Sequence, residues 1–191
     1  MKIGFRRAIS IGLISAATAG AAAQTAIVDP ALLTKANAGD AAAQLAVAEA
    51  FEKSDAAKPD YAQAATWYRR AADQNNSEAQ IRLAALYRDG RGVERDIAAA
   101  ANWYRRAAEQ GNASAQGTLG LLYSFGQGVP HSDEEAYYWL ALAAAVKGPD
   151  QEKYAANRQS MAARITTDEL ADAKDRVAKW IAAHPRPGAI E

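Results

Sequence analysis

The sequence predicts an all-α protein, an α-solenoid in which antiparallel helix pairs stack in a row. Three observations lead to this fold class. The stretch TWYRRAADQNNSEAQ, which begins at Thr66, recurs as NWYRRAAEQGNASAQ from Asn102, so the chain repeats itself every 36 residues. Alanine, the strongest helix former, dominates the apolar residues. Glycine or asparagine recurs with the same period where helices would end, and repeats of this length are typical of stacked helical hairpins.

The composition limits the chemistry that this sequence can carry. Its 191 residues, 50% hydrophobic and 8% aromatic, suffice for one sizeable domain. The sequence contains no cysteine, which excludes disulfides, thiolate metal sites and a cysteine nucleophile within it. Acidic and basic residues number 22 each, so no basic field suggests a nucleic-acid partner.

The N-terminus has the pattern of a secretory signal peptide covering residues 1–23. Three basic residues stand within the first seven positions, residues 8–20 are uncharged and modestly apolar, and small residues precede Gln24. We therefore expect cleavage after Ala23, a periplasmic or secreted protein, and no stable membrane insertion after cleavage. The alternatives are an uncleaved anchor, a disordered tail, or a cytoplasmic protein with an unprocessed N-terminus.

Residues 24–42 are expected to form an N-terminal capping helix. Asp29 is a good N-cap residue, and Pro30 suits the first helical position. The helix should therefore begin at this pair and continue to about Asn37. It would cover the end of the first repeat, because the terminal units of a solenoid need a solvent-compatible outer face.

Residues 43–150 contain three repeats, at about 43–78, 79–114 and 115–150. Each should consist of a helix A, a turn and a helix B. In the second repeat, apolar residues between Ala79 and Tyr87 form the inner stripe of helix A, and Asp96 caps helix B. The structural positions that keep the period are Gln44, Trp67, Gln80, Tyr87, Gly90, Gly92, Trp103, Gly111, Gln116, Tyr123, Gly126, Gly128 and Trp139.

Two sets of residues should reverse the chain within and between repeats. Gly90 and Gly92 follow helix A and permit positive φ angles. In the first repeat Ser54 and Ala56 stand where these glycines should be. The residues that end the helix before each repeat's helix A are Gly39, Asn75 and Gly111, all of types that tolerate the left-handed conformation. A single hairpin cannot bury its apolar stripe, so each copy needs a stacked neighbour.

Residues 151–184 should form C-terminal capping helices, with a tail at 185–191. A helical stripe begins at Tyr154 and includes Met161. Thr166 and Glu169 then have the spacing of a capping box. The last helix should turn four residues inward, Leu170, Ala173, Val177 and Trp180, and end before Pro185.

These motifs resemble the Sel1-like repeat (SLR) family, a branch of the tetratricopeptide-like solenoids. The resemblance covers about residues 39–147, although the third repeat has Leu140 where the family has tyrosine. In the second repeat the motif consists of Ala79, Gln80, Leu83, Ala84, Tyr87, Gly90, Gly92, Val93, Ala100, Trp103, Tyr104, Ala107, Ala108, Gly111 and Asn112. The resemblance implies a right-handed superhelix that serves as a scaffold for protein–protein contacts, often in exported proteins. Some exported relatives are associated with cell-wall fragments or β-lactams, but they carry paired cysteines that this sequence lacks.

The resemblance also implies that helix A lines the concave groove of the superhelix. The positions opposite its inner stripe would then face a protein or peptide partner. Leu121 and Phe125 either anchor that partner or pack under the closing helices, and we favour packing because solenoid ends need covering. The candidate partner-binding residues are Glu49, Arg82, Asp89, Thr118, Leu121 and Phe125.

The function we expect is that of a non-enzymatic, exported scaffold or adaptor without a cofactor or metal. An envelope enzyme acting on peptidoglycan fragments or β-lactams is the alternative. The sequence shows no nucleophile–base pair, no ligand cluster and no facing carboxylates for such chemistry. Neither His131 nor His184 has an acidic residue at the spacing of a metal motif.

The remaining polar and aromatic patterns have structural interpretations. The arginine pairs that begin at Arg69 and Arg105 are interpreted as solvated helix positions, paired with Asp73 and Glu109. The regularly spaced Trp and Tyr residues are interpreted as core packing rather than as a surface for sugars or bases.

Overall fold

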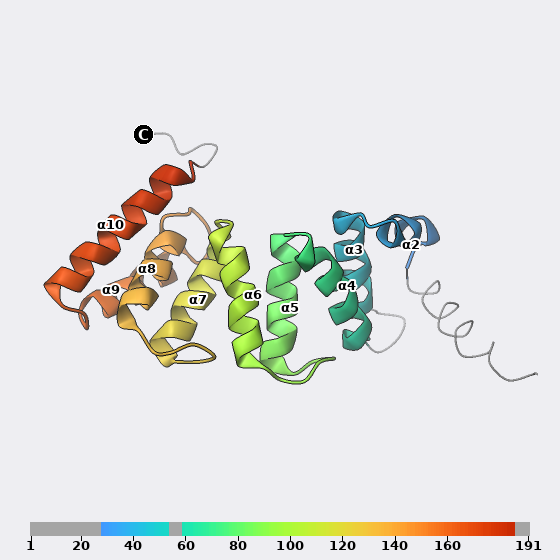
Figure 1. Cartoon of the computed structure of the whole chain (residues 1–191), viewed down its shortest axis with the longest axis horizontal. Coiled ribbons are helices and arrows are strands. Elements are labelled where there is room, and N and C mark those ends of the chain that lie inside the picture. The colour runs from blue at the N-terminus through green and yellow to red at the C-terminus, as the bar shows by residue number, and fades with distance from the viewer. Residues whose placement is uncertain (1–27, 54–58, 186–191) are drawn as a thin grey trace, which may run out of the picture.

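The computed structural model describes residues 28–53 and 59–185, and every element in that part of the chain is a helix. The helices lie side by side in one elongated row, with α2 at one end and α10 at the other (Figure 1). The predicted all-α solenoid is confirmed, whereas the signal peptide, Ser54 and Ala56 lie outside the described residues. The helices are α2 Pro30–Asn37, α3 Ala41–Glu52, α4 Tyr61–Asp73, α5 Ser77–Asp89, α6 Ile97–Glu109, α7 Ala113–Phe125, α8 Asp133–Ala144, α9 Gln151–Ala162 and α10 Thr167–Ala183.

The repeats correspond to three helix pairs, α3 with α4, α5 with α6, and α7 with α8. From α2 to α9, each helix packs extensively on the helix that follows it within this range. In the described part of the chain, one extensive contact joins helices that are not consecutive, namely α10 on α8. None of the described helices is both long and apolar enough to cross a membrane.

Side-chain caps fix where the helices begin. The predicted cap Asp96 accepts a hydrogen bond from the backbone N–H of Ala99 at 2.9 Å, and Asp29 caps α2 directly before Pro30. The capping box of Thr166 and Glu169 is present at the start of α10. An oxygen-bearing side chain at the N-cap satisfies backbone donors that the first helical turn leaves unpaired. The short polar residues in the sequence thus predict these boundaries correctly.

The turn between helices A and B rests on the start of the preceding helix B. Gly92 has a φ of +70°, and a Cβ atom there would lie 2.2 Å from the carbonyl carbon of Tyr61, the first residue of α4. Gly128 repeats this contact against Ile97, the first residue of α6. The second glycine of each turn therefore has two functions, because it reverses the chain and lets two backbones touch.

The helix ends before α3, α5 and α7 also follow the prediction. Gly39, Asn75 and Gly111 all have positive φ angles, at 100°, 64° and 86°. Asn75 is the only non-glycine residue with positive φ in the described part of the chain. Asparagine tolerates this conformation better than most residues because its short side chain can bond to the local backbone.

A buried glutamine in the first turn of each helix A connects it to the preceding helix. Gln44, Gln80 and Gln116 each donate from Nε2 to a backbone carbonyl, and the three bonds measure 3.1, 3.1 and 3.0 Å. In the first two repeats the glutamine Oε1 also accepts a bond, from Gln74 at 2.8 Å and from Gln110 at 2.7 Å. In the third repeat Gln116 Oε1 is buried and has no partner among the described residues.

The tyrosine-to-leucine change in the third repeat is matched by changes around it. In the first repeat buried Tyr68 donates to Glu52 at 2.5 Å, and burial together with this bond raises the pKa of Tyr68. In the third repeat Leu140 has no hydroxyl group, and Ser124, which replaces Glu52, bonds within its own helix. Gly120 leaves room for Leu140, since a Cβ atom at position 120 would lie 2.7 Å from Leu140 Cγ.

The closing helices cover the end of the stack unequally. In α9, Tyr154 and Met161 are buried, and the Tyr154 ring occupies the space that a side chain at Gly117 would need. In α10, Ala173 is fully buried, while Leu170, Val177 and Trp180 pack partly buried against the core. The inward stripe predicted for α10 is therefore confirmed.

Candidate functional site

The candidate partner-binding residues lie on α3, α5 and α7, the A helices of the three repeats. We call their shared surface the helix-A face, defined by Glu49 on α3, Arg82 and Asp89 on α5, and Thr118, Leu121 and Phe125 on α7. Since a helix turns by about 100° per residue, positions 82, 85 and 89 share one side of α5. Leu83 and Tyr87 lie on the other side of that helix.

The charged part of the helix-A face is internally paired. The contacts are Glu49 with Lys53 at 3.0 Å, Arg82 with Glu78 at 2.8 Å, and Asp89 with Arg88 at 2.8 Å and Arg91 at 3.0 Å. The hydrogen bond from Arg88 is the main reason that the pKa of Asp89 is lowered. Ion pairs as exposed as these contribute about 0–1 kcal/mol each, so a partner could replace them at little cost.

The apolar end of the helix-A face differs from our expectation. Phe125 is 69% exposed, so the prediction that it packs under the closing helices is wrong. Leu121 is half-buried. The equivalent positions Lys53 and Asp89 are also exposed, which shows that this last position of helix A lies outside the interface between repeats. The closing helix α9 instead covers the beginning of α7, where Tyr154 packs on Gly117.

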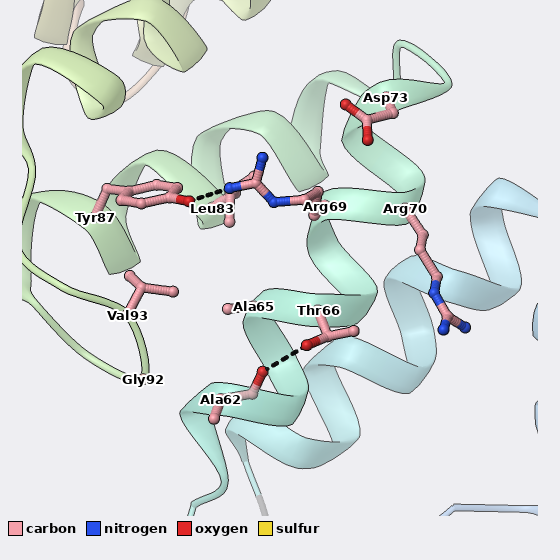
Figure 2. A pocket seen from close by; sticks show the side chains of 10 residues that line it. All are labelled: Ala62, Ala65, Thr66, Arg69, Arg70, Asp73, Leu83, Tyr87, Gly92 and Val93. Atoms are coloured by element: carbon pink, nitrogen blue, oxygen red, sulfur yellow. Dashed lines mark hydrogen bonds between the residues drawn. The ribbon is translucent and has the colours of Figure 1, made fainter.

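A pocket of about 430 Å³ lies on the other side of α5, between α4 and the turn that leads into α6 (Figure 2). We call it the α4–α5 pocket. Apolar side chains line one part and polar side chains another, and three separate segments contribute. The lining residues are Ala62, Ala65, Thr66, Arg69, Arg70, Asp73, Leu83, Tyr87, Gly92 and Val93.

Arg69 crosses this pocket toward Tyr87 (Figure 2). Its guanidinium donates a hydrogen bond to the Tyr87 hydroxyl. The Arg69 Cζ atom also lies 5.5 Å from the centre of the Tyr87 ring and 5.8 Å from that of Trp103. These contacts hold Arg69 by hydrogen bonding and cation–π attraction. The next repeat has the same arrangement, in which Arg105 donates to the Tyr123 hydroxyl at 2.9 Å.

The expected pairing of the arginines with acidic residues of their own helices is therefore wrong. Asp73 pairs weakly with Arg106 of the next repeat, at 3.9 Å, rather than with its own helix. Arg70 and Arg106 stack on the tryptophans of their own helices, at 4.3 Å on Trp67 and 4.5 Å on Trp103. Aromatic faces and the tyrosine of the next helix compete successfully with solvated carboxylates for these guanidinium groups.

The tryptophans at the repeat period are core residues with different exposure. Trp67 and Trp139 are buried, whereas Trp103 is half-buried between two arginines. The Nε1 atom of Trp139 is buried and has no hydrogen-bond partner in the described residues. The interpretation of these rings as core packing is confirmed for Trp67 and Trp139, while Trp103 also borders the solvent.

The histidines occupy ordinary structural positions. His131 lies 3.4 Å from Asp133 at the start of α8, and His184 stacks on Trp180 with ring centres 4.1 Å apart. Among residues 28–53 and 59–185, no group of three or more His, Asp or Glu side chains is arranged to hold a metal ion.

The sequence does not predict the α4–α5 pocket, although it assigns other roles to Arg69, Asp73, Tyr87 and Gly92. From the sequence alone, Tyr87 and Gly92 have structural roles and Arg69 is a solvated position. The signal that could have revealed the pocket is the coincidence of Arg69, Tyr87 and Trp103 with Arg105, Tyr123 and Trp139 at the same spacing. That coincidence becomes informative only when the side chains are known to meet across three helices.

Comparison with known proteins agrees with this architecture. One similar structure is that of c5321, a protective antigen present in uropathogenic Escherichia coli strains that displays an SLR fold. The match covers 84% of this chain at 27% sequence identity, and the two structures align with a TM-score of 0.68. This chain spans only 36% of that antigen. A Sel1 repeat protein from Oxalobacter formigenes is 32% identical over 68% of this chain and 95% of its own, with a TM-score of 0.60. No curated protein matches.

The family model agrees with the helix pairs. The Sel1 repeat matches residues 40–76, 77–112 and 113–145, which contain the three pairs from α3 to α8. These matches cover more than half of the chain, and the chain therefore belongs to the Sel1 repeat family.

Proposed function

We propose that this protein is an exported scaffold or adaptor that binds a protein or peptide partner on the helix-A face, with Phe125 as the main anchor. The observation that carries the proposal is the exposure of Phe125, 69%, because most large apolar side chains in the described part of the chain are buried or partly buried. In the described residues the other exposed large apolar side chain is Ile181, at 42%. Aromatic side chains that fill a partner's pocket contribute a large share of binding energy.

The surroundings of Phe125 support this role. Half-buried Leu121 lies one helical turn away on the same side of α7, so the two can form one apolar patch. The paired charges of α3 and α5 continue the surface toward the N-terminus and would orient a partner more than they would hold it. Because the helices already form a packed stack, binding would require little ordering of the scaffold.

Substitution of Phe125 tests the proposal. We expect that photocrosslinking in intact cells, with a photoreactive amino acid at Ala85 on the helix-A face, identifies a partner protein. Phe125→Ser should weaken binding of that purified partner by about 30-fold or more, the loss typical of an interface hot spot. Ile181→Ser is the matched control, because it removes an exposed apolar side chain from a different surface. Equal affinity for the Phe125 variant and the unsubstituted protein would refute the proposal.

Export is part of the same proposal and rests on the sequence pattern of residues 1–23. N-terminal sequencing of the protein purified from cells should find Gln24 as the first residue, in a periplasmic or secreted fraction. A cytoplasmic protein that begins at Met1 would contradict export without affecting the role of Phe125.

A further inference from the structure

We propose that the α4–α5 pocket is a second binding site, which takes the carboxylate of an acidic side chain on a partner protein. The inference depends on the proposed function only in that the occupant is a protein. The site lies on the side of α5 opposite the helix-A face. Its donors are Arg69 and Tyr87, which Figure 2 shows reaching toward one another across the pocket.

The charge of Arg69 is not neutralised within the described part of the chain. No ion pair forms between Arg69 and any carboxylate there, and Asp73, the acidic residue of the pocket, pairs with Arg106 instead. The Arg69 side chain is exposed, and its hydrogen bond goes to a neutral hydroxyl group. A guanidinium has five N–H donors, so donors remain for an incoming anion.

The Tyr87 hydroxyl provides a second donor next to the first. Its oxygen accepts the bond from Arg69, so its own proton is directed elsewhere. In the described residues no acceptor bonds to that proton. An Arg N–H and a Tyr O–H therefore meet at one end of the pocket, and both can donate to the two oxygens of one carboxylate.

Rigid surroundings hold these two donors in place. Arg69 belongs to α4 and Tyr87 to α5, and the guanidinium lies over the rings of both Tyr87 and Trp103. A donor pair that is already oriented loses little conformational entropy when a ligand binds. The repeat architecture thus supplies the preorganisation that two exposed side chains on a loop would lack.

The remaining lining favours a protein carboxylate over a free phosphate. The side chains of Ala62, Ala65, Leu83 and Val93 offer an apolar wall for the methylene groups of a Glu or Asp side chain and its neighbours. Asp73 at the rim would repel a multiply charged anion, whereas it can accept a hydrogen bond from a peptide N–H. The volume of about 430 Å³ is in the range of ligand sites and exceeds a single side chain.

The test uses short peptides and side-chain NMR signals of the protein. The probes are acetyl-Ala-Leu-Glu-Leu-Ala-amide, the same peptide with Gln in place of Glu, and inorganic phosphate. We expect the Glu peptide to shift the Arg69 Nε–Hε signal and the Tyr87 ring signals. The Gln peptide should bind about tenfold or more weakly, because hydrogen bonds to a charged group are roughly twice as strong as neutral ones.

Variants of the pocket complete the test. Arg69→Gln should weaken binding of the Glu peptide by about tenfold or more, and Tyr87→Phe, which keeps the ring, by about fivefold. The matched control is Arg158→Gln, because Arg158 belongs to α9, near the other end of the row of helices, and does not line the pocket. It should leave affinity within about twofold, as expected for a charge outside the contact.

Three results would overturn the inference: equal binding of the Glu and Gln peptides, equal losses from Arg69→Gln and Arg158→Gln, or shifts of the same signals by phosphate at the same concentration. Phe125→Ser should not change binding of the Glu peptide, since Phe125 lies on the helix-A face. A failure at the pocket and a failure at Phe125 are therefore distinguishable.

Discussion

The buried glutamine at the start of each helix A shows how a single position can connect consecutive repeats. Gln44 and Gln80 are satisfied at both ends of their amide groups, because Gln74 and Gln110 donate to their Oε1 atoms. A buried polar atom without a partner costs about 1–3 kcal/mol. The third repeat bears this cost at Gln116 Oε1.

The missing donor can be traced to one position. Val146 stands one repeat period after Gln110 and has no side-chain hydrogen-bond donor. We expect Val146→Gln to place an amide N–H near Gln116 Oε1 and to raise the free energy of unfolding by about 1 kcal/mol, the usual net value of a hydrogen bond. Urea denaturation measures the change as a higher midpoint with an unaltered slope.

A substitution without a donor serves as the control for this residue. Val146→Met has a side chain of comparable length but cannot donate a hydrogen bond. If both variants stabilise the protein equally, then apolar burial rather than the hydrogen bond is responsible. The sequence reveals the periodic glutamines, but it does not show that Gln74 and Gln110 reach them across two helices, because that contact depends on the packed geometry.

At the scale of elements, the turn between helices A and B determines how repeats fit together. A Cβ atom at Gly92 would lie within 2.2 to 2.4 Å of three backbone atoms at the start of α4. Backbone atoms inside a packed stack cannot move aside as the end of a flexible side chain can. The periodic glycines predicted the turns correctly, whereas their contact with another repeat follows only from the stacked arrangement.

Alanine substitutions separate the two functions of glycine in this chain. Gly39 and Gly92 both have positive φ, at 100° and 70°, but a Cβ atom at Gly39 would meet nothing within 4 Å. Gly39→Ala should cost about 1 kcal/mol, from backbone strain alone. Gly92→Ala should cost about 3 kcal/mol or more, because overpacking adds to the strain. Urea denaturation of both variants tests this difference, and equal losses would show that the turn adjusts freely.

For the whole molecule, stability should depend on position along the row of helices. Consecutive helices between α2 and α9 pack on one another, and α10 packs on α8. In such a stack, stability is approximately a sum of unit terms and nearest-neighbour terms, so disruption at one end should stay local. The repeat period predicted this architecture, because each copy carries the same caps and core residues.

The proposed binding surfaces are harder to predict from sequence than the fold. Residues that build the stack recur with the period, whereas a binding surface depends on which side chains remain uncovered. Phe125 is uncovered because the closing helix α9 packs on the start of α7 and not on its end. The α4–α5 pocket forms only where α4, α5 and the turn after α5 meet. The direction of Arg69 also depends on the packed structure, because its guanidinium lies near aromatic rings and not near Asp73.

The attachment of α10 provides a test of this local stability. Arg176 joins α10 to α8 through Glu134 at 3.0 Å and Glu135 at 2.6 Å, whereas Lys179 pairs within α10, with Asp175. Loss of the two half-exposed pairs in Arg176→Gln should cost about 1 kcal/mol in total and speed amide hydrogen exchange in α10 roughly fivefold. Exchange in α5 and α6 should not change, because unfolding spreads only through adjacent units. The matched control is Lys179→Gln, which should leave amide exchange in α10 as slow as in the unsubstituted protein. Faster exchange throughout the described helices in Arg176→Gln would instead show that the stack unfolds as a single unit.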